Sequence, residues 1–187
     1  VNSDEIKIKS LLIKNGFHEV INDPFTPENN ETSIEVDNPL DSSRKFLRTS
    51  LKKSLLDNLI YNERRQQESI KLFEIADTYT HLSTEPKRFI GIIVSGRVDN
   101  NHIDFSQRLD KKYLLNFLND YFEKIDPNII TAIDRNDFKS KSNNAIVYAE
   151  IDFDKLNIIK KNFNEIYKVN NLDKRYIPIS DYPSSTR

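Results

Sequence analysis

Apolar side chains recur along this chain with two different periods, and the changes between them predict its helices and strands. Between Asp4 and Asn15 the apolar positions are three and four residues apart, acidic residues open the run, and Gly16 follows it. This combination favours a helix. The same spacing predicts a second helix after a cap at Ser50 and a third from about Asp110 to Lys124.

Segments with a period of two, or with unbroken apolar runs, predict strands. FHEVINDPF and TSIEVDNP carry β-branched residues and are the first two. From Ile70 to Asp77 alternate residues point to opposite faces, and RFIGIIVSGRV is almost wholly apolar, which is typical of a central strand covered on both faces. NIITAID and NAIVYAEID are the last two strands predicted.

A final helix is expected after Asp152, which can cap it, with Leu156, Ile159 and Phe163 inside. The elements then follow the order helix, two strands, helix, two strands, helix, two strands, helix. Strands that arrive in adjacent pairs can be joined by hairpins, whereas strict alternation would imply a parallel sheet. The order therefore predicts an α+β domain whose mostly antiparallel β-sheet is flanked by helices.

Composition indicates one folded core and excludes several classes of protein. The chain has 187 residues, of which 37% are hydrophobic and 30% charged, and its net charge is −1. Such a balance gives no general attraction to phosphate polymers or anionic membranes. The chain lacks Cys, which excludes disulfides and thiolate metal sites, and no apolar run approaches the roughly 18 residues of a membrane span. We therefore expect a soluble cytoplasmic protein with no membrane partner.

Few residues indicate enzymatic chemistry. The three glycines are too few for a phosphate-binding loop, the three histidines are far apart in sequence, and no Ser lies in a G-x-S-x-G elbow. Gly91 and Gly96 are expected to relieve crowding in or after a strand.

Carboxylates on or just beyond the predicted strands could converge on a divalent metal, as in a nuclease. These residues are Glu74, Asp77, Glu150, Asp152 and Asp154. The run Glu150-Ile151-Asp152 is not followed by the Lys that such nucleases commonly use, and Asp152 and Asp154 also fit the start of a helix. No catalytic and no metal-binding residue is therefore assigned.

Basic residues gather around the second predicted helix. They are Arg44, Lys45, Arg48, Lys52, Lys53, Arg64 and Arg65. A solvated helix face commonly has this composition, and acidic neighbours dilute the charge. The alternative is an RNA-facing patch, for which the candidates are Arg48, Lys52, Lys53, Arg64 and Arg65.

The first half of the chain contains the segments KNGFHEVINDPF, VDNPLDSSRKFLRTSLKKSLLDNLIYNERR and IKLFEIADTYT. In this order they resemble the beta subunit of bacterial phenylalanyl-tRNA synthetase, within its catalytic-like domain. RFIGIIVSGRV, LDKKYLLNFLNDYF and AIVYAEIDFDKL agree more loosely, and YIPISDYPSSTR resembles the linker to a following anticodon-binding domain. On this resemblance the domain spans residues 1–175 and the linker residues 176–187.

The resemblance implies a class II aminoacyl-tRNA synthetase fold that does not itself form the aminoacyl-adenylate. IKLFEIADTY, which resembles motif two, has no Arg to hold ATP, and no Gly-rich stretch ending in Arg follows it. The chain departs from the family pattern at Lys53-Ser54, where Pro-Gly is common. It also departs between Asp134 and Asn144, where a longer His-Pro-Gly and Gly-Glu-Leu-His-Pro region is missing.

The implied role is assembly with the phenylalanyl-tRNA synthetase alpha subunit in an alpha2-beta2 ligase. ATP, magnesium and phenylalanine are expected on the alpha subunit, with no cofactor on this chain, and tRNA(Phe) is expected to bind the whole enzyme. The stretch from Ile6 to Phe25 resembles motif one, which forms subunit contacts. Interface or interface-supporting residues are expected to be Leu11, Leu12, Phe17, Val20, Ile21 and Phe25. Core packing is the alternative for each, and a free-standing RNA-binding module or a metal-dependent nuclease are the alternative functions.

Overall fold

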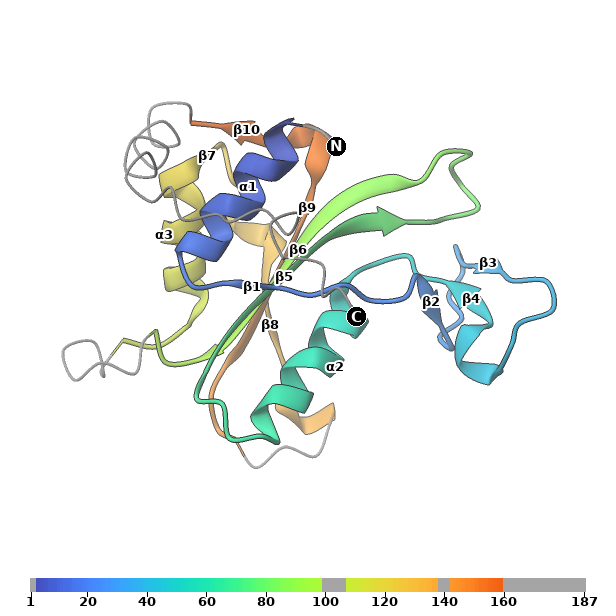
Figure 1. Ribbon diagram of the computed structural model, residues 1–187, viewed down its shortest axis with the longest axis horizontal. Coiled ribbons are helices and arrows are strands. Elements are labelled where there is room, and N and C mark those ends of the chain that lie inside the picture. The colour runs from blue at the N-terminus through green and yellow to red at the C-terminus, as the bar shows by residue number, and fades with distance from the viewer. Residues whose placement is uncertain (1–2, 99–106, 138–141, 160–187) are drawn as a thin grey trace, which may run out of the picture.

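A five-stranded sheet forms the centre of the computed structural model, which describes residues 3–98, 107–137 and 142–159 (Figure 1). The strand order is β1-β5-β6-β9-β8. The strands are β1 (His18–Glu19), β5 (Ser69–Thr78), β6 (Lys87–Gly96), β9 (Ile146–Asp152) and β8 (Ile130–Ile133). All neighbours pair antiparallel except β1, which runs parallel to β5 at one edge. The mostly antiparallel sheet predicted from the sequence is thus observed. The linker predicted for residues 176–187 lies outside the described residues.

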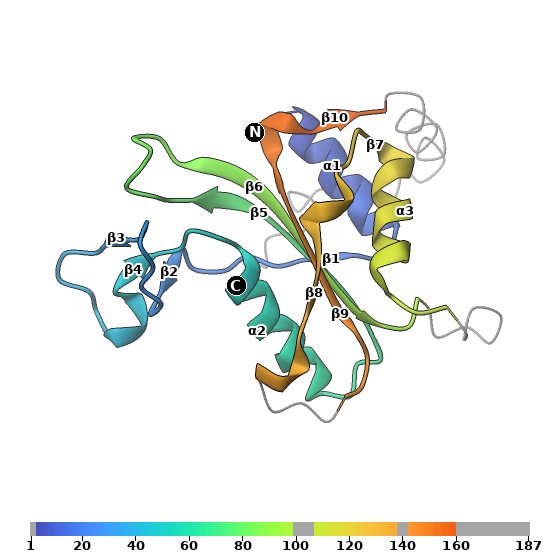
Figure 2. The ribbon, with the colours of Figure 1, turned by 180° about the vertical axis from the view of Figure 1, so that it is seen from behind.

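Helices cover both faces of this sheet (Figures 1 and 2). On one face α1 (Ser3–Lys14) and α3 (Lys111–Tyr121) pack against Phe73, Ile92 and Val147. On the other face α2 (Lys52–Glu63) packs against Leu72 and Ile93. The alternation predicted from Ile70 onward and the central position of RFIGIIVSGRV are therefore confirmed.

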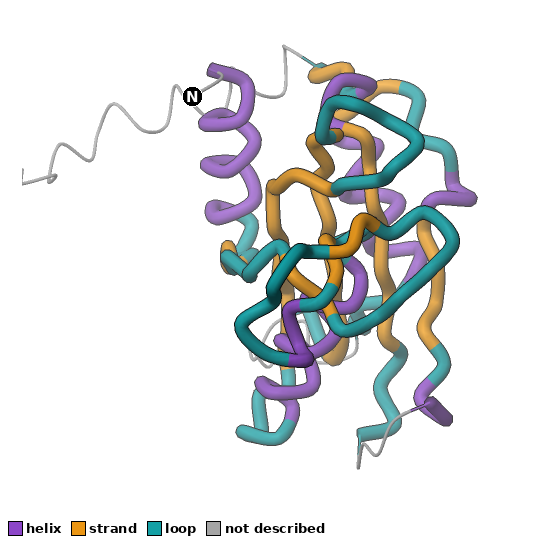
Figure 3. The backbone as a smooth tube through the Cα atoms, turned by 90° about the vertical axis from the view of Figure 1, so that its right-hand side faces the viewer, coloured by secondary structure: helices purple, strands orange, loops and turns teal. Residues whose placement is uncertain are grey.

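A small sheet lies beside the main one and faces the viewer in Figure 3. It consists of β2 (Phe25–Thr26), β4 (Phe46–Leu47) and β3 (Ile34–Glu35), with the 3-10 helix η1 (Ser42–Arg44) between β3 and β4. A further pair joins β7 (Phe122–Glu123) to β10 (Asn157–Ile158). The remaining 3-10 helices are η2 (Pro127–Ile129), η3 (Arg135–Asp137) and η4 (Phe153–Lys155).

Two expectations about helix starts are wrong. Asp152 caps only the short η4, because its carboxylate accepts from the Asp154 N–H at 3.2 Å, and the chain then enters β10 instead of a long helix. Phe163, expected inside that helix, lies outside the described residues. The N-cap position of α2 is Leu51 and not Ser50, although the Ser50 hydroxyl accepts from the Lys52 N–H.

Both strand glycines are required by close approaches. A Cβ at Gly91 would lie 2.7 Å from Cδ1 of Leu55 and 3.0 Å from Cβ of Leu51, so α2 rests directly on β6. Gly96 has a φ of +99°, and a Cβ there would lie 1.8 Å from the Glu68 carbonyl oxygen. Both positions confirm the relief of crowding expected from the sequence.

Candidate functional site

Three of the six interface candidates belong to the core of the chain itself. Leu11 and Leu12 on α1 and Phe17 after it are fully buried with Phe73 and Phe117. Because no surface remains on these side chains, they can support an interface only from inside. The apolar spacing of α1 identified a buried face correctly, but apolar spacing alone does not distinguish a core from a contact surface.

The other three candidates lie nearer the surface. Ile21 is 90% exposed, whereas Val20 and Phe25 are half-buried. Two residues that the sequence interpretation did not include, Ile6 and Ile13, are 52% and 55% exposed on α1. They are seven residues apart and therefore share one helix face, opposite the buried one. That seven-residue spacing is the feature of the sequence that could have identified Ile6 and Ile13 as interface candidates. We call Ile6, Ile13 and Ile21 the exposed isoleucines.

An ion-pair cluster fixes α1 to the sheet. The Arg88 guanidinium of β6 donates to both carboxylate oxygens of Glu5, at 2.9 and 3.1 Å, and to Asp77 at 3.1 Å. Lys9 bridges Glu5 and Glu19 at 3.2 and 2.8 Å. Burial acts to raise the pKa of Glu5, but hydrogen bonds from Arg88 and Lys9 outweigh it, so this pKa lies below its usual value.

The carboxylate of Glu74 on β5 lies in a buried polar network. It accepts from the Arg48 guanidinium at 2.9 Å and from the Asn22 side-chain amide at 2.8 Å. Arg48 also donates to the Asp77 carbonyl at 3.2 Å. Arg48 is only 7% exposed, so its assignment as an RNA-facing residue is wrong. Its charge is paired with that of Glu74 inside the domain.

Glu150 on β9 satisfies the beginning of α2 from across the sheet. Its carboxylate accepts from the Ser50 hydroxyl and from the Leu51 N–H, both at 2.8 Å, and from the Tyr148 hydroxyl. Unsatisfied N–H groups and the helix dipole both favour an anion at this point. Burial, followed by the Glu150 charge, raises the pKa of Tyr148 well above its ordinary value.

Four of the five carboxylates considered for a metal site thus serve separate places in the fold. Glu74 binds Arg48, Asp77 binds Arg88, Glu150 caps α2, and Asp152 caps η4. In the described ranges, no group of three or more His, Cys, Asp or Glu side chains could hold a metal ion.

A third charged cluster joins the end of α2 to the opposite edge of the sheet. The Arg135 guanidinium donates to Glu63 at 3.0 Å and to the Ser95 hydroxyl at 3.1 Å. Glu63 is the last residue of α2, and Ser95 lies on β6. Arg135 therefore links η3, α2 and the central strand.

The basic candidates on α2 lie at its two ends. Lys52 and Lys53 are exposed at the first turn, and Lys53 forms an ion pair with Asp57. Arg64 and Arg65 are exposed just after the last turn. The guanidinium carbon of Arg65 lies 3.4 Å from the centre of the Tyr61 ring.

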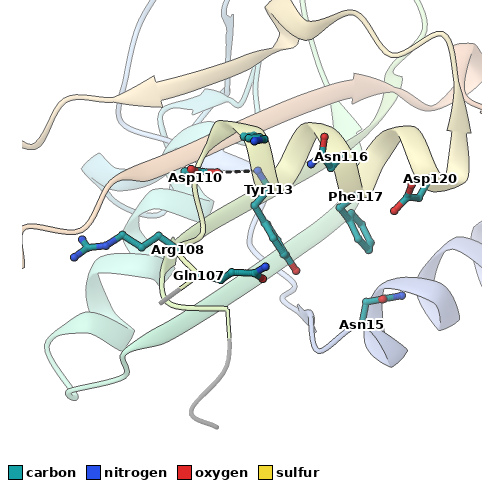
Figure 4. Close-up of a pocket in the computed structure, with 9 residues that line it drawn as sticks. Asn15, Gln107, Arg108, Asp110, Tyr113, Asn116, Phe117 and Asp120 are labelled. Carbon is teal, nitrogen blue, oxygen red and sulfur yellow. Dashed lines mark hydrogen bonds between the residues drawn. The ribbon is translucent and has the colours of Figure 1, made fainter. Parts of the chain in front are cut away.

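A surface hollow of about 670 Å³ lies between the end of α1 and the first turns of α3 (Figure 4). Tyr113 and Phe117 line it together with Asn15, Gln107 and Asn116. Asp110 at its rim is engaged as the cap of α3, where it accepts from the Tyr113 N–H at 2.8 Å. The carboxamides and aromatic rings can contact a ligand, but they include no nucleophile paired with a base.

A second hollow, of about 660 Å³, lies between the small sheet and the beginning of α2. Phe25, Pro27 and Leu56 supply its apolar part, and Lys52 and Lys53 lie at its border. Its lining also includes Arg48, which is buried and forms an ion pair with Glu74. This hollow likewise lacks an acid–base pair.

None of the helices in the described ranges combines the length and apolar character needed to cross a bilayer.

A family model described as the phenylalanyl tRNA synthetase beta chain CLM domain matches residues 2–149. The phenylalanine–tRNA ligase beta subunit of Fusobacterium nucleatum is 35% identical over 107 residues, which are 50% of this chain and 13% of that protein. The beta subunit from Buchnera aphidicola of Acyrthosiphon pisum is 34% identical over 98 residues, 46% of this chain and 12% of that protein. The chain therefore matches only a small part of these relatives.

A solved structure of the pyrrolysyl tRNA synthetase PylSc from Desulfitobacterium hafniense shares the fold. The TM-score is 0.52 at 14% identity, and the alignment covers 81% of this chain and 65% of that one. At this identity the similarity concerns the fold alone.

Proposed function

The chain belongs to the family of the phenylalanyl tRNA synthetase beta chain CLM domain, and from this premise we propose that it is a non-catalytic docking domain with a class II synthetase fold. In this proposal it supports the alpha subunit of a cytoplasmic phenylalanine–tRNA ligase, which charges tRNA(Phe). ATP, magnesium and phenylalanine bind to the alpha subunit, and the complete assembly is alpha2-beta2.

The observation that carries the proposal is the occupation of both sheet faces by the chain's own side chains. Leu51 and Leu55 lie so close to β6 that even a methyl group at Gly91 would collide with them. On the opposite face α1 and α3 bury Phe73 and Ile92. A substrate on the middle of this sheet would have to displace a helix, which favours a structural role.

The exposed isoleucines provide a chemically suitable contact surface. Ile6 and Ile13 share the outer face of α1, and Ile21 extends from the segment after β1. Burying an apolar side chain of this size in an interface stabilises the complex by about 1.5–3 kcal/mol for each side chain that becomes fully buried. The underlying ion-pair cluster of Glu5 and Arg88 holds α1 in place for such a contact.

The nuclease alternative loses its motivation because Glu150 and Asp152 act as caps for α2 and η4.

Two measurements on the chain test the docking proposal. Calorimetric titration with ATP, magnesium and phenylalanine is expected to give no saturable heat. Mixing with a cognate alpha subunit is expected to give co-elution on a sizing column. Saturable binding of ATP or phenylalanine would reject the non-catalytic assignment.

A matched pair of variants localises the contact. Ile21→Asp places a charge on the exposed isoleucines and is expected to weaken co-elution at least tenfold. Leu82→Asp makes the same change at a similarly exposed leucine in the β5–β6 turn and is expected to leave it unchanged. Equal behaviour of the two variants would remove Ile21 from the interface.

A further inference from the structure

The two ends of α2 differ in how much positive charge they present. The helix has 12 residues, or about 18 Å of length, so its ends form separate surfaces. At the beginning Arg48 is buried against Glu74, and Lys53 is paired with Asp57. At the end Arg64 and Arg65 are both exposed. An anionic partner therefore meets the greater basic surface at the end of α2.

Two further arginines come to this end from distant parts of the sequence. Arg97, just after β6, forms an isolated antiparallel bridge with Arg108. The Arg97 N–H also donates to the Glu68 carbonyl at 3.0 Å. Glu68 is three residues from Arg65, so their Cα atoms are at most about 11 Å apart. We call the four residues the arginine edge: Arg64, Arg65, Arg97 and Arg108.

Backbone geometry fixes this arrangement. Gly96 allows the Glu68 carbonyl to approach β6 to a distance at which any Cβ would collide. The segment after α2 is thereby held against the end of β6. Arg108 also lines the hollow beside α3, and Figure 4 shows its side chain extending away from Tyr113 and Phe117. The arginine edge therefore adjoins that hollow through Arg108.

The arginine edge concentrates like charges at a cost to the fold. Residues paired in an antiparallel bridge project to the same face, and like charges placed opposite one another are destabilising. Of the carboxylates around it, Glu63 is bound to Arg135, Asp110 caps α3, and Glu68 is exposed. A polyanion that neutralises several arginines at once would relieve this repulsion.

Arg65 is already arranged for such a partner. Its guanidinium stacks on Tyr61, whose side chain is 55% exposed, and it donates to the Tyr61 carbonyl at 3.4 Å. A planar guanidinium binds phosphate through two parallel hydrogen bonds, and an exposed Tyr ring can stack with an unpaired base. This combination fits RNA better than an acidic peptide, which offers carboxylates but no bases.

We propose that the arginine edge binds the sugar-phosphate backbone of RNA. The contact goes beyond docking on the alpha subunit, because it gives this domain its own surface for RNA. It also differs from the basic neighbourhood inferred from the sequence, because it lies at one end of α2 and adds the exposed Arg108 and the half-buried Arg97, one of whose guanidinium nitrogens is buried. Each neutralised phosphate releases counterions, so the binding must weaken steeply with salt.

The test is fluorescence anisotropy of a labelled tRNA(Phe) transcript titrated with the chain at several salt concentrations. The double variant Arg64→Gln/Arg65→Gln is expected to bind at least tenfold more weakly, and its salt slope should fall by about one for each arginine that contacts phosphate. Arg108→Gln is expected to weaken binding in the same way.

The control is Lys52→Gln/Lys53→Gln, which removes the same charge from the other end of the same helix. Apart from the loss of affinity that removing any two positive charges causes, it is expected to change the affinity by less than about twofold. An equal loss in both double variants, no binding by the native chain at low salt, or displacement of the RNA by polyglutamate at equal charge concentration would each overturn the proposal.

Co-elution with the alpha subunit separates this inference from the docking proposal. Arg64→Gln/Arg65→Gln is expected to co-elute like the native chain while losing RNA affinity. Retained RNA binding without co-elution would reject docking and leave the arginine edge intact. Retained co-elution with unchanged RNA affinity in that variant would reject the arginine edge alone.

Discussion

At the scale of single residues, Arg48 and Glu74 form an ion pair at 2.9 Å with both side chains buried. The attraction between such charges is offset by the loss of their hydration, so the pair as a whole contributes little stability. Removing one partner is different, because the other charge then stays buried without compensation. Asn22 also donates to Glu74, but it carries no charge to replace that of Arg48.

Arg48→Met is therefore expected to lower the free energy of unfolding by about 3–5 kcal/mol. Adding Glu74→Gln should restore part of the loss, since the buried charge is then gone. Urea unfolding of the two single variants and the double variant measures the coupling. Arg64→Met, at an exposed arginine, should stay within about 0.5 kcal/mol of the native chain. Strictly additive losses would show that the two charges are not coupled.

Residue types and their strands were predictable at this scale, but their partners were not. Glu74 and Glu150 were correctly placed on strands. Their functions depend on Arg48, 26 residues away, and on Leu51, 99 residues away. A periodic pattern carries no information on contacts of that separation. The same limit explains why Arg48 was grouped with exposed basic residues.

At the scale of elements, α1 depends on charges that titrate. The pKa of Glu5 is lowered below 4.5 by Arg88 and Lys9 despite its burial. A lowered carboxylate pKa contributes stability above the unfolded value, and this contribution disappears as the pH falls through the folded value. Hydrogen bonding to Glu19 raises the pKa of Lys9 above 10.5, so its contribution is present at lower pH and is lost only as the pH rises past that value.

The free energy of unfolding is therefore expected to decrease as the pH falls below about 4.5, and Glu5→Gln should reduce that dependence while lowering stability at pH 7. Urea unfolding between pH 3 and 7 checks both effects. Asp57→Asn, at an exposed carboxylate on α2, is the control and should follow the native pH profile. A Glu5→Gln curve parallel to the native one would assign the acid sensitivity to other groups.

The long elements were predictable because each is long enough to repeat its pattern of apolar positions several times. Residues Asp4 to Asn15 were expected as a helix, and α1 spans Ser3–Lys14. β4, β7 and β10 have two residues each, too few to show any alternation, and they were missed. The helix expected after Asp152 failed because a cap residue fits a 3-10 turn as well as a helix.

At the scale of the whole molecule, one sheet separates two apolar clusters and contributes to both. β5 supplies Phe73 and Ile75 to the cluster under α1 and α3, and Ile70 and Leu72 to the cluster under α2. The sequence predicted this division through alternation and through the continuous apolar run of β6. It did not predict which helix covers which face, since amphipathic helices of similar composition fit either side.

Because the clusters share β5, β6 and β9, neither can lose its packing without exposing strands that the other needs. We therefore expect one cooperative thermal transition in which calorimetric and van't Hoff enthalpies agree. Gly91→Ala, which crowds only the α2 face, should lower the midpoint of the whole transition, with a cost of about 1–3 kcal/mol. Differential scanning calorimetry distinguishes the outcomes. If Gly91→Ala instead splits the transition in two, α2 and its cluster unfold independently, and the sheet does not couple its two faces.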